Sequence, residues 1–173
     1  MGKLIADEPR MCYITGLHNA HAMETQAIQL LTRQVERLEN YPELEARMRM
    51  HIEESKVQRT RLEEVLNTLD EQHSALKEAV LGLGGNLAAM AHTAASDEIL
   101  KNTLANFMFE HFEIAAYKSL IAMSEFLDHP AGAAAARASL REEEQMAAWL
   151  DERIAPTTIT FLERVQAGIT ADH

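Results

Sequence analysis

The sequence is poor in the residues that stabilise small secreted proteins or strand-rich folds. Cys12 is the only cysteine among 173 residues, which excludes an intrachain disulfide or a multi-cysteine zinc site and fits a reducing compartment. Proline and glycine are scarce, with 4 and 7 copies, and only 5% of residues are aromatic. Because aliphatic residues, alanine and methionine supply most of the apolar content, the composition favours helices over strands.

Other absences limit the functional classes. The sequence has no apolar run of transmembrane length, and its first residues lack the hydrophobic stretch of a secretory signal. The formal net charge of −11 argues against non-specific nucleic-acid binding, because phosphates would be repelled. We therefore expect a cytoplasmic protein that binds neither nucleic acid nor a membrane. The length of 173 residues fits a single domain with a substantial core.

Breaks in the helical periodicity divide the chain into four expected helices. Pro9 suits the first turn of a helix, and a period near 3.6 predicts the first helix at about 8–39. Further helices are expected at about 43–81, 96–127 and 131–155. A short helix at about 87–92 lies in the connection between the second and third, and Pro156 is expected to open a short amphipathic tail.

The lengths of the connections predict the topology. The turns at 40–42 and 128–130 are short and therefore join antiparallel helices, whereas the glycine-containing stretch after the second helix is long enough to run along a bundle. A simple up-down bundle has no such crossover. The sequence therefore predicts an all-α, ferritin-like four-helix bundle with one long crossover.

Each expected helix carries glutamate on an otherwise apolar stripe. Glu24, Glu110 and Glu143 lie within the stripes of the first, third and fourth helices, and Glu113 lies on a flank. In the second helix the stripe centres near His51 and Gln58, with Glu54 towards one edge. Carboxylates are rarely buried unless they are paired or bind a metal, so the pattern predicts a cation site in the bundle. Oxygen and nitrogen ligands without thiolates suit iron or manganese, although zinc can occupy the same site.

Simpler interpretations remain open for these residues. Glu24, Glu110 and Glu143 could form salt bridges between helices or lie near helix ends by chance. Glu54 and Glu113 could be solvated or could support a ligand instead of being one, and His51 could be a hydrogen-bonded core histidine. Gln58 could hydrogen-bond a ligand or pack between helices.

Several other polar residues are interpreted as structural. Core packing is the favoured role of Tyr117, and a pair on the helix surface is the favoured interpretation of His18 and His21. The charged run that begins at Arg61 indicates a solvated face, and Glu142 points away from the stripe of its helix. Trp149, Phe161 and Leu162 indicate packing or an oligomer surface.

Two segments resemble a known family. The run His51-Ile-Glu-Glu54-Ser-Lys-Val-Gln58-Arg-Thr-Arg-Leu62 is similar to the His-x-x-Glu-[Thr/Ser]-x-x-Gln-x-x-Arg-Leu segment of the YciE/YciF family of bacterial ferritin-like proteins. The run Glu110-His-Phe-Glu113-Ile-Ala-Ala-Tyr117 resembles that family's Glu-His-Tyr-Glu-Ile-Ala-x-Tyr. Ala22-Met-Glu24-Thr-Gln26 and the pair Glu142-Glu143 resemble its first-helix and last-helix motifs. The similarity extends from about Leu17 to Ile154.

The resemblance implies a di-metal carboxylate centre. Its candidate ligands in this chain are Glu24, His51, Glu54, Glu110, Glu113 and Glu143. The chain departs from the wider di-iron pattern, since Val57 and Met146 stand where a Glu-x-x-His would place histidines. We expect two divalent ions, with iron first and manganese or zinc as alternatives.

Two functions follow as hypotheses. The first is a stress-related protein that reacts with peroxide or dioxygen through its bound metal. The alternative is a metal-free helical-bundle protein that acts through oligomerisation. In either case we expect a homodimer or a larger homo-oligomer.

Overall fold

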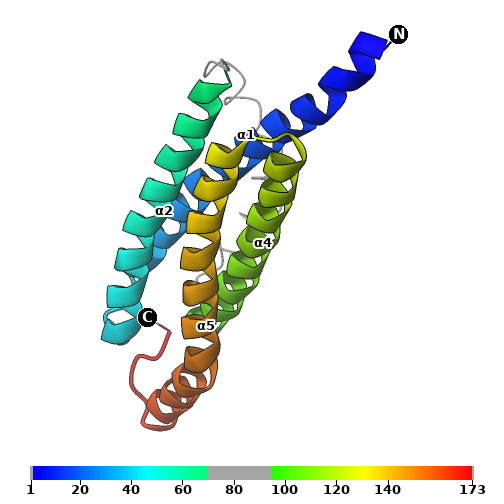
Figure 1. The fold of residues 1–173 in the computed structure, drawn as a ribbon. Coiled ribbons are helices and arrows are strands. Elements are labelled where there is room, and N and C mark those ends of the chain that lie inside the picture. The colour runs from blue at the N-terminus through cyan, green and yellow to red at the C-terminus, as the bar shows by residue number, and fades with distance from the viewer. Residues whose placement is uncertain (1, 70–94, 173) are drawn as a thin grey trace.

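The computed structural model of the chain describes residues 2–69 and 95–172, and within these ranges the protein is built from helices without strands. The helices are α1 (Gly2–Val35), α2 (Pro42–Thr68), α4 (Glu98–Phe126) and α5 (Pro130–Gln166). They pack side by side as a four-helix bundle (Figure 1). The predicted all-α bundle is therefore confirmed.

The order of the helices requires one long connection. α1 and α2 form an antiparallel hairpin, as do α4 and α5 (Figure 1). Arg10 of α1 donates a 2.7 Å hydrogen bond to the carbonyl of Leu69 after α2, whereas Arg37 after α1 pairs with Glu98 at the start of α4. α2 thus ends at one end of the bundle and α4 begins at the other, so these two helices run parallel. This is the crossover topology that the sequence predicts.

Several helix boundaries differ from the sequence-based expectation. α1 begins at Gly2, with Pro9 inside it, and ends at Val35 instead of near residue 39. α2 ends at Thr68, where the amide of Leu69 donates to the carbonyl of Leu66 in a tight turn, and the rest of the helix expected to reach residue 81 lies outside the described residues. The expected short helix at about 87–92 lies outside the described residues.

The expected separate tail after Pro156 is also wrong, because α5 continues through this proline to Gln166. A proline inside a helix removes one hydrogen bond to the carbonyl four residues earlier. Here both Pro156 and Glu152 are exposed, so water can reach the carbonyl that loses its partner. Beyond the proline, Phe161 is buried, and the hydroxyl of Tyr41 donates a 2.6 Å hydrogen bond to the carbonyl of Ala171. These contacts hold the C-terminal part of the chain against the bundle.

The core consists of two apolar clusters with a polar layer between them. The first cluster contains Tyr13, Leu17 and Leu62, and the second contains Leu31, Met48 and Leu150. Ser55, Gln58 and Glu143 fall between the positions that feed these two clusters. Ion pairs and hydrogen bonds place the buried residues Glu24, His51, Glu110 and Glu113 at the same level, and together the seven form the polar layer. Burying so many polar groups at one level of a bundle is unfavourable unless they have partners.

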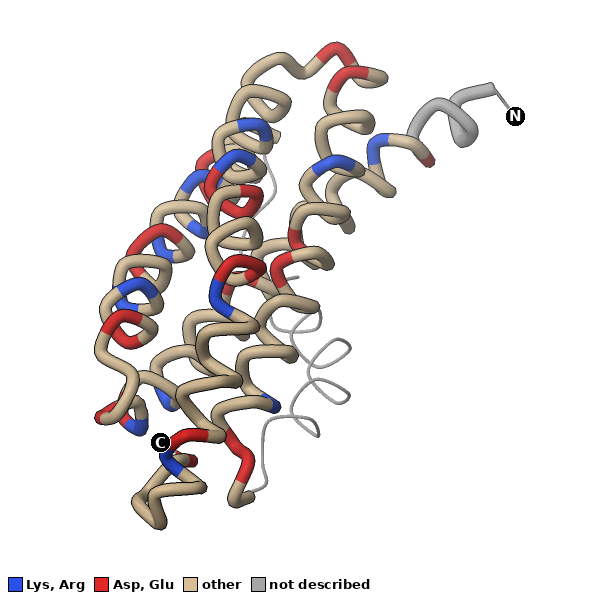
Figure 2. The backbone as a smooth tube through the Cα atoms, turned by 90° about the horizontal axis from the view of Figure 1, so that it is seen from below, with Lys and Arg blue, Asp and Glu red and all other residues tan. Residues whose placement is uncertain are grey.

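Positions of lysine, arginine, aspartate and glutamate are spread along the helices (Figure 2). Many form pairs one turn apart, such as Arg49 with Glu45 and Lys101 with Asp97. Exposed pairs of this kind contribute roughly 0–1 kcal/mol each, so they say little about function. No helix in the described ranges has the length and apolar character required to cross a membrane.

Candidate metal centre

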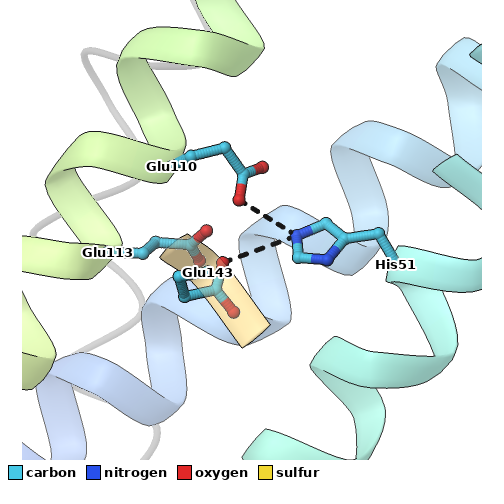
Figure 3. A group of neighbouring side chains, drawn as sticks. All are labelled: His51, Glu110, Glu113 and Glu143. Atoms are coloured by element: carbon cyan, nitrogen blue, oxygen red, sulfur yellow. Dashed lines mark ion pairs between the residues drawn. The ribbon is translucent and has the colours of Figure 1, made fainter. Parts of the chain in front are cut away.

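Four buried side chains from three helices converge in the polar layer. They are His51 of α2, Glu110 and Glu113 of α4, and Glu143 of α5, and one ligand atom from each lies within 4.8 Å of the others. Figure 3 shows the three carboxylates and the imidazole directed toward one another. The three-residue spacing of Glu110 and Glu113 places both on the same face of α4. The sequence therefore presents two carboxylates from one helix and one ligand from each of two others.

The imidazole of His51 faces acids on both sides. Its Nε2 atom lies 3.2 Å from Oε2 of Glu110 and 3.5 Å from Oε2 of Glu143. Its Nδ1 atom lies 2.9 Å from Oε2 of Glu54, which also accepts a 2.9 Å hydrogen bond from Arg47. A carboxylate on Nδ1 fixes the ring orientation and leaves Nε2 as the atom for a metal, a common arrangement for metal-binding histidines.

Glu24 belongs to the same layer but not to the group of four. Its side chain is fully buried, and its Oε1 atom accepts a 2.6 Å hydrogen bond from the hydroxyl of Tyr117. Its charge interacts with those of Glu110 and His51. Glu24 therefore lies near enough to Glu110 and His51 for their charges to affect its protonation.

Burial strongly affects the protonation of the acids. It raises the pKa of Glu24 to about 8, against the opposing effects of Tyr117 and His51. It raises the pKa of Glu143 to about 9, and burial together with the neighbouring carboxylates raises the pKa of Glu113 well above its usual range. Without a cation, these carboxyls therefore hold protons at neutral pH.

The pKa of His51 is also raised, but by the neighbouring carboxylates and not by burial. Burial lowers the pKa of its imidazole, but the carboxylates of Glu110, Glu54 and Glu143 together outweigh this effect and bring the pKa well above its usual value. For Glu54, the hydrogen bond with His51 is the largest cause that lowers the pKa to about 2, and Arg47 contributes further. Glu54 is therefore ionised throughout the physiological range.

Buried polar atoms that make no hydrogen bond indicate whether a metal ion fits in the layer. Several buried ligand atoms make no hydrogen bond, although His51 Nε2 and Glu110 Oε2 form an ion pair: Glu24 Oε2, His51 Nε2, Glu110 Oε2, both oxygens of Glu113, and Glu143 Oε2. Most buried polar atoms in proteins have at least one partner, so such a concentration at one place needs an explanation. Divalent cations accept electron pairs from carboxylate oxygens and from a neutral imidazole nitrogen. The donor set therefore fits divalent metal ions.

The structure brings together four of the six ligands that the sequence predicted. His51, Glu110, Glu113 and Glu143 form the group, whereas Glu24 lies beside it. The side chain of Glu54 is 29% exposed and reaches the far nitrogen of His51, as expected for a residue that supports a ligand. Tyr117, for which packing was the favoured role, is buried and also hydrogen-bonds Glu24.

A set of polar contacts beside the group was not predicted from the sequence. Arg61 donates hydrogen bonds of 2.6 and 2.8 Å to the two oxygens of Glu142, and Gln58 donates to Glu142 and to Glu143. The solvated role given to Arg61 and the outward role given to Glu142 are therefore wrong. The spacing of Gln58 and Arg61, one helical turn apart, is the signal that could have linked them.

The surface role given to the histidine pair is also wrong. His18 is buried, and His21 is mostly buried, with its Nε2 atom 2.8 Å from Oε1 of Glu63 on α2. His21 therefore links α1 to α2.

Known proteins share this fold. A protein from Xanthomonas campestris pv. campestris matches with a TM-score of 0.78 and 29% sequence identity, covering 92% of this chain and 99% of its own. The stress protein YciF of E. coli matches with a TM-score of 0.70 and 22% identity, covering 85% and 94%. YcfI of Rhodopseudomonas palustris matches with a TM-score of 0.66 and 23% identity, covering 83% and 92%.

A sequence profile gives the family. The profile of a domain of unknown function (DUF892) matches residues 8–163, which include α2, α4, most of α1 and α5, and every residue of the candidate centre. This match, with YciF among the proteins of the same fold, confirms the resemblance seen in the sequence motifs. The chain belongs to the DUF892 family.

Proposed function

We propose that this protein binds two divalent metal ions, preferentially iron, in the polar layer and uses them to react with peroxide or dioxygen. The observation that carries the proposal is the group His51, Glu110, Glu113 and Glu143, whose ligand atoms lie within 4.8 Å of one another. Most of these atoms lack a hydrogen-bond partner although they are buried. A cation would supply the missing partner to several of them at once.

The available atoms support a pair of ions. His51 offers Nε2, Glu110 and Glu143 each offer Oε2, and Glu113 offers both oxygens. Glu24 adds Oε2 from α1. Four carboxylates and one imidazole carry enough negative charge to balance two divalent ions, as in carboxylate-bridged metal pairs.

The surrounding residues would control protons and water. Because burial keeps Glu24 and Glu143 protonated without a cation, binding of metal should release protons from the layer. The apolar clusters on both sides of the layer exclude bulk water. Two bound ferrous ions would supply two electrons, which with two protons reduce one hydrogen peroxide to two water molecules.

Metal content tests the proposal directly. Protein purified without chelator or a nickel column should contain, or take up, about two ions of iron or manganese per chain. Glu143→Gln should bind metal more weakly, whereas Glu144→Gln, which changes an exposed glutamate at the next position, should bind as the wild type does. Wild-type protein that binds no ion under iron-replete or manganese-replete conditions would contradict the proposal.

Oxidation rate tests the redox part separately. Ferrous-loaded wild-type protein should oxidise faster with hydrogen peroxide or oxygen than free ferrous iron does, and Glu110→Ala should lose this acceleration while its helical circular-dichroism signal persists. Equal rates for wild type, variant and free iron would leave metal binding intact but contradict the redox activity.

A metal-free role in self-association is the second candidate. Leu104, Met108 and Phe112 are spaced four residues apart on α4 and are 56%, 46% and 45% exposed. Such a stripe suits contact with another apolar surface. Sedimentation of metal-free and metal-loaded protein would show whether association depends on the ions, and a metal-free oligomer with no bound ion would favour this second function.

A further inference from the structure

Gln58 connects a partly exposed ion pair with a buried candidate ligand. Its side chain is fully buried on α2, and its Nε2 atom donates a hydrogen bond to Oε1 of Glu143 and a 3.0 Å hydrogen bond to Oε2 of Glu142. Glu142 is held in turn by both terminal nitrogens of Arg61, at 2.6 and 2.8 Å. An arginine that binds both carboxylate oxygens fixes the position of that carboxylate. The four residues thus form a fixed series of contacts between α2 and α5.

The hydrogen bond to Glu143 distinguishes between its two oxygens. Oε1 is occupied by the amide of Gln58, whereas Oε2 has no hydrogen-bond partner and lies 3.5 Å from Nε2 of His51. The orientation of the amide follows from its surroundings, because two carboxylates face it and only its NH2 group can donate to them. Its own Oε1 atom is left buried without a partner. Gln58 therefore keeps this orientation although one of its own atoms remains unpaired.

We propose that Gln58 is a positioning residue, which is held by the Arg61–Glu142 pair, binds Oε1 of Glu143 and leaves Oε2 as the oxygen that this carboxylate presents to a metal ion. The inference rests on the proposed metal-binding function. A neutral amide suits the task because it orients the carboxylate without neutralising it, whereas a lysine or arginine at this position would compete with the cation.

Titration with Co²⁺ tests the role, because the visible absorption of bound Co²⁺ depends on the number and arrangement of its ligands. In Gln58→Leu, which has a similar volume but no donor, both oxygens of Glu143 become available. We expect Co²⁺ to bind about 10- to 100-fold more weakly than in wild type, as is typical when a residue that orients a ligand is removed. The absorption spectrum of the bound ion should also change.

Gln34→Leu is the matched control. Gln34 is a buried glutamine on α1 that accepts a 2.8 Å hydrogen bond from Asn106 of α4. It lies ten residues from Glu24, which is about 15 Å along the helix. Gln34→Leu removes a buried contact between helices and should lower the melting temperature, but its Co²⁺ affinity and spectrum should match those of wild type.

Arg61→Met provides a second variant at a partly exposed position, where the fold is less at risk. It leaves Glu142 without its arginine, and we expect a smaller loss of Co²⁺ affinity in the same direction. Wild-type affinity and spectrum in Gln58→Leu would overturn the positioning role. If Gln58→Leu does not fold, unchanged affinity and spectrum in Arg61→Met would overturn it. Failure of the wild type to bind Co²⁺, iron or manganese would instead overturn the proposed function, and the positioning role with it.

Discussion

The hydroxyl of Tyr117 donates a 2.6 Å hydrogen bond to Oε1 of Glu24 and thereby joins α4 to α1 within the polar layer. Both side chains are fully buried, so water cannot take the place of either partner in this hydrogen bond. The bond occupies one oxygen of Glu24 and leaves Oε2 without a hydrogen-bond partner. Glu24 thus resembles Glu143, in which a different neighbour occupies one oxygen.

Tyr117→Phe should affect both stability and metal binding. The variant leaves Oε1 of Glu24 buried without a donor, which typically destabilises a protein by about 1–3 kcal/mol. We also expect weaker metal binding, because Glu24 is no longer held in place. Tyr13→Phe is the control, since it removes the hydrogen bonds of Tyr13 with Ser124 and His129 in another part of the bundle. If both variants bind metal as the wild type does, Glu24 does not depend on Tyr117 for its role.

Two substitutions at Glu54 should separate a ligand from a supporting residue. In Glu54→Gln the amide oxygen can still accept from Nδ1 of His51, whereas Glu54→Ala has no acceptor. If Glu54 only orients the imidazole, Glu54→Gln should bind metal nearly as well as wild type, and Glu54→Ala about 10- to 100-fold more weakly. Calorimetric titration measures both affinities. Equal losses in the two variants would indicate that Glu54 itself binds the metal.

The metal-free protein should become less stable as pH rises from about 5 to 9. A carboxyl whose pKa is higher in the folded than in the unfolded state stabilises the fold at low pH, and this contribution is lost as pH rises through the folded pKa. Glu24 and Glu143, with pKa values of about 8 and 9, act in this direction. The raised pKa of His51 has the same sign, because its charged form is the one that the folded state favours.

Thermal melts at a series of pH values would test this dependence. Below pH 5 the trend should reverse, because Glu54 has a lowered pKa of about 2 and its stabilising contribution is lost as pH falls. Saturation with Mn²⁺ should reduce the loss of stability above pH 7, since the cation replaces the protons. A melting temperature that is flat between pH 6 and 9 in the metal-free protein would indicate that the layer is hydrated.

Removing several acids together should be tolerated better than removing one. Glu110→Ala takes away a carboxylate 3.2 Å from His51 and leaves a buried charge without this partner, a change that typically costs about 3–5 kcal/mol. A variant with Glu24, Glu110 and Glu143 all changed to glutamine replaces three buried ionisable groups with neutral amides of the same volume, so His51 no longer has to be charged. We expect the triple variant to melt at the higher temperature in metal-free buffer. The same melting temperature for both variants would contradict a dry layer.

Gly132 lies on α5 beside Tyr13, and its substitution by alanine should destabilise the protein. A Cβ atom at this position would clash with the hydroxyl oxygen of Tyr13 and stand 2.7 Å from Nδ1 of His129. We expect Gly132→Ala to destabilise the protein by about 1–3 kcal/mol, measured by denaturant unfolding. Gly16→Ala, whose nearest contact is 3.1 Å from a leucine methyl group, should have a smaller effect. Equal stabilities of wild type and Gly132→Ala would show that the Tyr13 contacts contribute little.

The sequence by itself determined the helical class, the crossover topology and most of the candidate ligands. These features depend on the local period of the helix, which sets Glu24, Glu110 and Glu143 among apolar neighbours regardless of how the helices pack. The sequence could not determine where α5 ends, because a proline such as Pro156 is tolerated inside a helix when it lies on the exposed face.

The tertiary structure alone decided how the polar residues combine. Whether Glu54 turns toward the metal layer or toward the far nitrogen of His51 depends on side-chain rotamers and on the rotation of α2, which a helical period does not specify. In the same way, Arg61 and Glu142 are charged residues near the edges of two separate stripes, and only the packing of α2 against α5 brings them together. The ligand residues follow from short-range periodicity, whereas the choice of free oxygen on each ligand follows from contacts between helices.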